Sequence, residues 1–146
     1  MPVKRRKHHT EMLTRSVEIS TFRVSLSLRI DEPRMPDPEF ETTPWLELRG
    51  TLNEPIRDVR NVLFSVYPKD KVVVGTARPA SVASIIQIRP EVSVVSALPH
   101  VDFDRMLSMT FAGQVRFAWM FFTKPHYGRG LVKNLSFSNE REDDDV

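Results

Sequence analysis

The segment that decides the fold class reads Phe22-Arg23-Val24-Ser25-Leu26-Ser27-Leu28-Arg29-Ile30. Apolar and polar side chains alternate strictly along it, which is the two-residue period of a strand with one face in the core and one in water. A helix would spread the same apolar side chains around its whole circumference. Val17 and Ile19, just upstream, are apolar on the opposite phase, so the pattern slips near Ser20-Thr21. The sequence therefore predicts a half-buried strand, with a β-bulge or a junction of two strands at the slip.

More strands are predicted downstream by the same alternation and by enrichment in β-branched residues. They cover residues 45–52, 59–67, 71–74, 81–98 (one strand, or two separated at Pro90), 114–123 and 131–137. In 81–98, residues of one parity are apolar and predict a shared face: Val82, Ile86, Ile88, Val92, Val94 and Leu98. The nearly continuous apolar run in 114–123 predicts a strand that is covered on both faces. Four prolines among acidic residues predict a surface loop over 31–44.

One helix is predicted over residues 102–112. One stripe of this segment is apolar at helical spacing, formed by Phe103, Met106, Leu107, Thr110 and Phe111. Asp102 stands where an N-cap belongs, and Gly113 stands where a helix commonly ends. About eight strands with this single short helix predict a mainly β protein, either an antiparallel β-sandwich or a small barrel. The pattern does not decide between the two architectures.

The bulk composition is that of one globular domain. The chain has 146 residues, of which 40% are hydrophobic and 27% charged, enough to build a core of its own. It contains no cysteine, which excludes disulfide scaffolds, thiolate metal sites and cysteine nucleophiles. No segment approaches the roughly 20 apolar residues of a membrane span, and no apolar signal-peptide core follows the basic N-terminus. We therefore expect a soluble, cytoplasmic protein.

Charge is concentrated at the two ends of the chain. Residues 1–15 hold five cations and one carboxylate, whereas residues 140–146 hold five carboxylates and one arginine. We predict a disordered basic arm over 1–15, a single β domain over 16–139 and an acidic tail over 140–146. The cluster Lys4, Arg5, Arg6 and Lys7 is typical of basic arms that bind nucleic-acid phosphates without base-sequence specificity.

The best candidate ligand site is the loop Lys124–Gly130. Its side chains Lys124, His126, Tyr127 and Arg129 offer cations, an imidazole and a phenol, which could hold an anion. The alternative is a plain β-turn in which Gly128 and Gly130 supply positive φ angles.

Other chemical signals are weak. His100, Asp102 and Asp104 could ligate a metal, but the same spacing is explained by a helix cap, and we predict no metal site. The phosphate-binding motifs GxGxxG and GxxxxGK[ST] and the catalytic elbow GxSxG do not occur, so no catalytic residue and no cofactor is predicted.

The expected function is therefore a non-catalytic binding module whose partner is a protein. One alternative is non-specific nucleic-acid binding through the basic arm. Another is a small-ligand or enzyme domain with a pocket near the 124–130 loop. The oligomeric state stays open at this stage.

Overall fold

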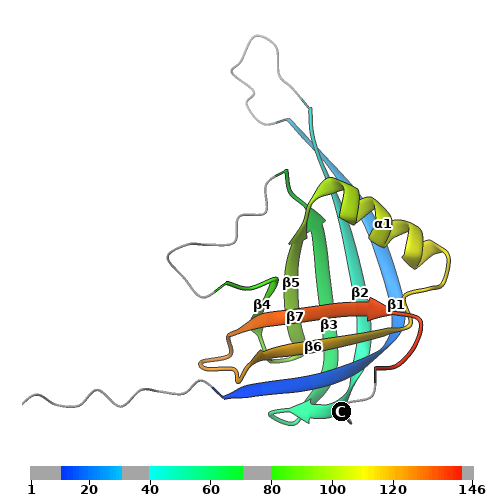
Figure 1. Ribbon diagram of the computed structural model, residues 1–146. Coiled ribbons are helices and arrows are strands. Elements are labelled where there is room, and N and C mark those ends of the chain that lie inside the picture. The colour runs from blue at the N-terminus through cyan, green and yellow to red at the C-terminus, as the bar shows by residue number, and fades with distance from the viewer. Residues whose placement is uncertain (1–10, 31–39, 71–79, 143–146) are drawn as a thin grey trace, which may run out of the picture.

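The computed structural model describes residues 11–30, 40–70 and 80–142, which form a closed barrel of seven strands with one helix (Figure 1). The elements are β1 (Met12–Ile30), β2 (Phe40–Ile56), β3 (Val59–Pro68), β4 (Ala83–Gln87), β5 (Val92–Leu98), α1 (His100–Phe111), β6 (Phe117–Thr123) and β7 (Gly130–Ser138). The predicted mainly β class is confirmed, and closure decides for the barrel. The predicted strand at 71–74 lies outside the described residues.

The strands follow the order β1-β2-β3-β5-β4-β7-β6 around the barrel, and β6 returns to β1. Neighbouring strands are antiparallel except β3 and β5, which run parallel. Inward-facing side chains fill the interior, and the largest fully buried ones include Phe64, Phe122, Leu46, Leu48 and Met120. The helix α1 closes part of one end of the barrel by burying Phe103, Met106 and Thr110.

The predicted bulge in β1 is confirmed by a register shift between Ile19 and Thr21 in its pairing with β2. Gly50 lies opposite Ile19 on β2. A Cβ atom on Gly50 would stand 2.4 Å from the Glu18 carbonyl oxygen and 2.7 Å from Val17 Cγ1. The two backbones therefore approach so closely at the bulge that only glycine fits there.

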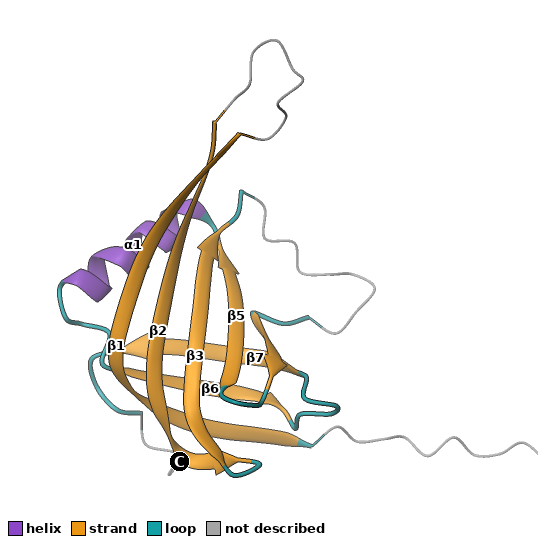
Figure 2. Ribbon diagram, turned by 180° about the vertical axis from the view of Figure 1, so that it is seen from behind, coloured by secondary structure: helices purple, strands orange, loops and turns teal. Residues whose placement is uncertain are grey.

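The predicted burial of the apolar face of residues 22–30 is wrong, although the strand itself is confirmed. Side chains on that face are 38% to 67% exposed: Phe22, Val24, Leu26, Leu28 and Ile30. The reason is that β1 pairs with β6 only over Met12–Glu18, whereas its pairing with β2 continues to Ile30. Residues 21–30 and 40–49 thus form an extension, here called the ribbon, whose outer part, residues 25–30 paired with 40–45, is two-stranded among the described residues and projects beyond the barrel (Figure 2).

The loop predicted over 31–44 is wrong at its C-terminal end, because β2 already begins at Phe40. Pro44 stands opposite Leu26 in the ribbon. On its other side β2 pairs with β3 only from Leu46 onward, so within the described residues Pro44 sits on a strand edge. Proline is tolerated at such an edge because no ladder hydrogen bond is lost there.

Two predicted faces also need correction. Val82, just before β4, and Ile86, within it, are about half exposed, while Ala83 and Ile85 are buried. A register shift between Ile85 and Gln87 changes the phase, so residues of the predicted parity do not all face the core, although Ile88, Val92 and Val94 are buried. The split into two strands near Pro90 is confirmed. In β6 the inner side chains are buried and the outer ones only partly so. Its outer face is therefore only partly covered, and α1 packs mainly against β3 and β5.

The predicted helix is confirmed, but its start is displaced. It begins at His100 with Pro99 as N-cap residue, so Asp102 lies in the first turn and does not cap the helix. Asp102 there complements the positive end of the helix dipole. Gly113 ends the helix as predicted, with φ at 71°. Hydrogen bonds from Gly113 to the Thr110 carbonyl and from Gln114 to the Met109 carbonyl complete the Schellman motif.

The N-terminal boundary of the barrel also differs from the prediction. Residues 12–15 were expected in the disordered arm, yet β1 begins at Met12 and pairs with β6 from that residue. Leu13 packs against the core. The local sequence is too polar to indicate this order, because the order comes from pairing with a strand about a hundred residues away in the chain.

We expect Gly50→Ala to destabilise the barrel by about 1–3 kcal/mol, the usual range for forcing an extra methyl group into a tightly packed site. Urea unfolding followed by tryptophan fluorescence measures this as a lower midpoint. Thr51→Ala is the matched control, since Thr51 is the next residue on β2 and its side chain is exposed. Equal midpoints for the two variants would contradict the close approach at the bulge.

Candidate functional site

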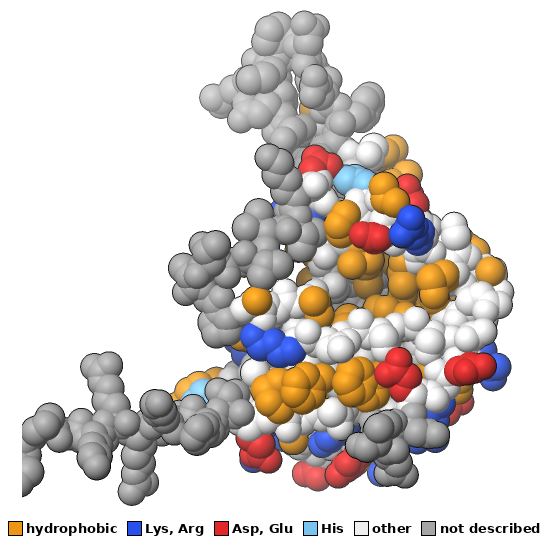
Figure 3. Space-filling model, in the orientation of Figure 1, with side chains coloured by type: hydrophobic (Ala, Val, Ile, Leu, Met, Phe, Trp, Pro, Cys, Tyr) orange, Lys and Arg blue, Asp and Glu red, His pale blue; other side chains and the backbone are white. Residues whose placement is uncertain are grey.

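The strongest candidate site is a cavity at the barrel end where α1 lies. It has a volume of about 340 Å³. It is lined by Val66, Ser81, Val82, Ser96, Ala97, Leu98, Pro99, Leu135 and Phe137. Figure 3 shows apolar side chains gathered in the hollow between α1 and β7. None of the lining residues carries a formal charge, so the cavity offers an apolar surface.

The cavity exists because the strands differ in where they end. In Figure 1, β6 and β7 cross the front of the barrel well below the ends of β3 and β5. The helix α1 starts directly after β5, through Leu98 and Pro99, and packs over β3 and β5. The backbone of Lys69 donates a 2.7 Å hydrogen bond to the Leu98 carbonyl and holds this corner in place. The space between α1 and β7 is therefore left open.

Two contacts define the interior of the cavity. The ring of Phe137 packs edge-on against Phe64, with 5.3 Å between ring centroids, so aromatic surface forms part of the wall. The Ser96 hydroxyl donates a 2.9 Å hydrogen bond to the Val82 carbonyl. Because this bond lies within the wall, Ser96 is satisfied without a ligand. A bound molecule would accordingly meet mostly hydrocarbon.

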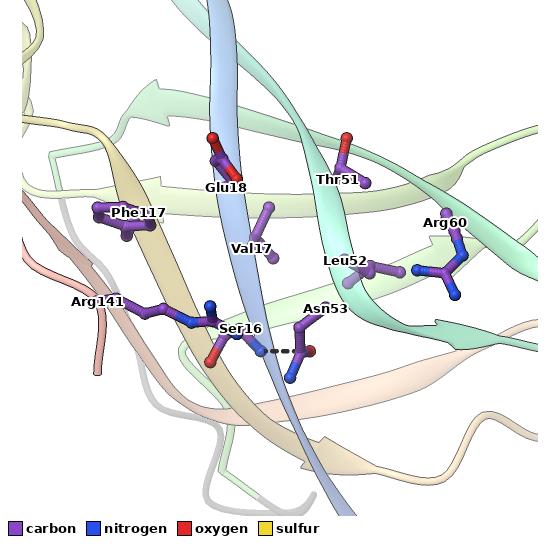
Figure 4. A pocket seen from close by; sticks show the side chains of 9 residues that line it. All are labelled: Ser16, Val17, Glu18, Thr51, Leu52, Asn53, Arg60, Phe117 and Arg141. Carbon is purple, nitrogen blue, oxygen red and sulfur yellow. Dashed lines mark hydrogen bonds between the residues drawn. The ribbon is translucent and has the colours of Figure 1, made fainter. Parts of the chain in front are cut away.

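A second, smaller hollow lies on the outer wall and is polar. It has a volume of about 180 Å³ and is lined in part by Glu18, Arg60 and Arg141 (Figure 4). Its edge is held by a 3.0 Å hydrogen bond from the Ser16 backbone to Asn53 Oδ1. The charged side chains around it are exposed, and the Glu18 carboxylate offsets part of the arginine charge. These features favour the apolar cavity as the binding site.

The predicted ligand loop forms a tight hairpin turn between β6 and β7. Tyr127 and Gly128 both have positive φ, 51° and 74°, as a type I′ turn requires. His126 and Arg129 exchange backbone hydrogen bonds of 2.8 and 3.0 Å across it. The four predicted side chains are exposed at the surface.

The structure brings only some of these side chains together. The His126 and Tyr127 rings touch, with centroids 4.2 Å apart. Lys124 instead pairs with Glu11, with 3.3 Å between its Nζ atom and Glu11 Oε2. Tyr127 and Gly128 line a shallow surface hollow together with Arg57 and Arg89. No residue of the loop lines the apolar cavity.

Two of the three candidate metal ligands, His100 and Asp102, already contact a partner side chain. His100 Nε2 lies 2.8 Å from Asp70 Oδ1, and Arg105 lies 3.7 Å from Asp102. Among the described residues no three histidine, aspartate or glutamate side chains are grouped in a way that could hold a metal ion. The predicted nucleic-acid residues Lys4, Arg5, Arg6 and Lys7 lie outside the described part of the chain.

The observed class is a closed, mixed β-barrel with one helix over its end and an apolar cavity beneath that helix. Within residues 11–30, 40–70 and 80–142, no helix combines the length and the apolar character that crossing a membrane requires. Comparison with known protein families, with curated proteins and with solved structures gave no match. Function has to be inferred from the geometry of the site.

Sequence reasoning missed the cavity because its residues look like ordinary core. Val66, Leu135 and Phe137 lie on strand positions whose alternation predicts burial. Whether such side chains meet a neighbour or an empty space depends on where distant strands end. The local pattern contains no signal for that.

We expect Tyr127→Asn to stabilise the protein by roughly 0.5–1 kcal/mol, because asparagine adopts the left-handed conformation of a type I′ turn more readily than tyrosine does. Thermal unfolding should show a higher midpoint. His126→Asn is the control, since His126 precedes the turn and has no positive φ. A lower midpoint for Tyr127→Asn would mean that the contacts of the 89% exposed Tyr127 ring outweigh its backbone strain.

Proposed function

We propose that this protein is a non-catalytic binding protein that takes up a small apolar molecule in the cavity beneath α1. The single observation that carries the proposal is a cavity of about 340 Å³ whose lining holds no charged side chain. This volume falls within the roughly 300–1,000 Å³ of typical ligand pockets, which are mostly apolar with few polar groups. Barrels of about eight strands either fill their interior with side chains or hold one small ligand, and here the cavity lies at the end of a filled barrel.

The chemistry of the lining supports binding rather than catalysis. A general acid or base must lie within hydrogen-bond reach of the reacting atom. Among the described lining residues, Ser81 and Ser96 carry the hydroxyls, and Ser96 is already bonded to the Val82 carbonyl. No histidine, carboxylate or lysine of the described residues lines the cavity to activate either serine.

The expected ligand is a compact hydrocarbon or aromatic molecule with few polar groups. Burial of apolar surface would supply the binding free energy, at about 25 cal/mol per Å² removed from water. A charged ligand would lose its hydration in this cavity without gaining a partner charge. Of the functions expected from the sequence, small-ligand binding is thus the one the geometry favours, at a place other than the 124–130 loop.

Titration with the apolar fluorescent dye N-phenyl-1-naphthylamine tests the proposal. We expect saturable binding by the unmodified protein and by Ser136→Trp, and at least tenfold weaker binding by Leu135→Trp. The indole of Leu135→Trp would fill the cavity, whereas Ser136 does not line it and precedes Phe137 on the same strand. Thermal midpoints of both variants verify that they fold.

Two outcomes would refute the cavity as the binding site. One is the absence of saturable dye binding by the unmodified protein. The other is equal dye affinity of the two folded tryptophan variants. If instead the dye binds as expected, native mass spectrometry of protein purified under mild conditions would identify a natural ligand by its retained mass.

A further inference from the structure

We propose that a second copy of this chain covers the apolar face of the ribbon, with the two ribbons packed face to face about a twofold axis. This contact is separate from the cavity and does not depend on the proposed ligand. The ribbon consists of residues 21–30 of β1 and 40–49 of β2, and its outer part, residues 25–30 with 40–45, stands clear of the barrel in both ribbon views (Figures 1 and 2).

One face of the ribbon is apolar along its whole length in β1. It presents Phe22, Val24, Leu26, Leu28 and Ile30, which are exposed to solvent. Directly paired residues of antiparallel strands share a face, and the partners of Val24 and Phe22 are the buried Leu46 and Leu48. The apolar face is therefore a continuation of the barrel interior beyond the barrel.

The opposite face of the ribbon suits water. It carries Arg23, Ser25, Ser27 and Arg29 on β1. Arg23 stands opposite Glu47 in the pairing with β2, which places unlike charges side by side. All charged side chains that β1 contributes to the ribbon thus lie on this face. Burial away from water would therefore be favourable only for the apolar face.

The root of the ribbon is held on both faces, so the apolar face has a defined position. On the inner side the ring of Phe22 packs edge-on against Phe111 of α1, with centroids 5.7 Å apart. On the outer side Trp45 stacks on Tyr67 of β3, with centroids 5.3 Å apart and ring planes within 6°. Phe111 is itself 64% exposed and extends the apolar surface onto the helix.

The exposed area matches what a dimer needs. Applying the exposed fractions to side chains of ordinary size gives on the order of 500 Å² of apolar surface per chain for the ribbon and Phe111. Two such faces in contact would bury on the order of 1,000 Å², which reaches the lower bound for a specific protein interface. Monomeric proteins seldom leave a continuous apolar patch of this size in water.

A second ribbon is the occupant that fits this surface best. The apolar stripe over residues 22–30 is about 30 Å long, at roughly 3.3 Å per residue, and an identical ribbon has the same length, the same twist and the same apolar stripe. Two ribbons stacked about 10 Å apart form a small β-sandwich, in which both apolar faces are covered. A pair of isolated strands is only marginally stable by itself, so the second layer also stabilises the ribbon.

Face-to-face packing is favoured over edge-to-edge pairing of the two ribbons. Among the described residues the edge of β1 beyond the bulge has no strand partner on the side away from β2, so edge pairing is sterically open. However, it would join the two apolar faces into one larger exposed surface. With Leu26 on the twofold axis it would also set Arg23 of one copy against Arg29 of the other. Stacked faces keep these arginines in water.

The oligomeric state of matched variants tests the proposal. Leu28→Asp places a charge on the apolar face, and Ser27→Asp places the same charge on the polar face at the adjacent residue. Sedimentation velocity at about 100 μM protein should show dimers for the unmodified chain and for Ser27→Asp, and monomers for Leu28→Asp. Since Leu28 is 67% exposed, all three should keep the same thermal midpoint within a few degrees.

Cysteine cross-linking tests the geometry of the contact. The chain has no cysteine of its own, so every cross-link must form at an introduced cysteine. With a short bifunctional thiol cross-linker, Leu26→Cys should give a covalently linked dimer and Ser25→Cys should give none, because only the former faces the twofold axis; a direct disulfide would be too short for faces about 10 Å apart. Equal cross-linking of the two would overturn the face-to-face arrangement. So would an assembly larger than two, since a symmetric contact closes at the dimer.

Other occupants of the apolar face are separate outcomes of the same experiments. A monomeric unmodified chain at 100 μM overturns the proposal. Binding of that monomer to phosphatidylcholine vesicles, lost in Leu28→Asp and kept in Ser27→Asp, would identify a lipid surface as the occupant instead. None of these results bears on dye binding in the cavity, which Leu135→Trp tests independently.

Discussion

The structure depends on one pairing, between Met12–Glu18 at the start of β1 and β6 near the end of the chain, because this pairing closes the barrel. Closure removes the sheet edges and encloses the apolar side chains of both strands. It also uses only the first third of a strand that has 19 residues. The rest of β1 follows β2 past the closed section and has no enclosed interior to face. The ribbon is thus a direct consequence of where the closing contact ends.

The same mismatch of strand lengths produces the cavity. β6 and β7 enclose the lower part of the barrel, while β3 and β5 continue upward, and β5 leads into α1 through Pro99. The helix buries Phe103 and Met106 and packs mainly against β3 and β5. An apolar interior is therefore left partly open on one side. The cavity and the ribbon thus both result from the unequal lengths of the strands, and they lie at the same end of the molecule.

Local chemistry predicted the elements of this fold well, and their surroundings poorly. The alternation in 22–30 correctly indicates an extended chain, and Gly113 and Gly128 correctly mark a helix end and a turn, because each depends on the residue and its immediate neighbours. Alternation indicates which side chains share a face of a strand. It does not indicate whether that face packs against another segment or is exposed to solvent. The exposed face of β1, the displaced phase of β4 and the cavity around Leu135 all depend on contacts between distant segments. For the candidate site, the sequence predicts a small-ligand pocket only as an alternative and near residues 124–130, none of which lines the cavity beneath α1.

Exposed apolar side chains differ greatly in what they imply, and the ribbon shows why. Val82 and Ile86 are each about half exposed, yet they stand singly on the short strand β4 and its approach, as is common on protein surfaces. The five apolar side chains of the ribbon are continuous, lie on one face and add little to the stability of the barrel. An exposed apolar strand of this length also promotes uncontrolled association. A defined partner on that face would prevent such association, and burial of the apolar side chains would contribute binding free energy. The alternation in 22–30 is therefore better explained by a contact between two molecules than by packing within a single molecule.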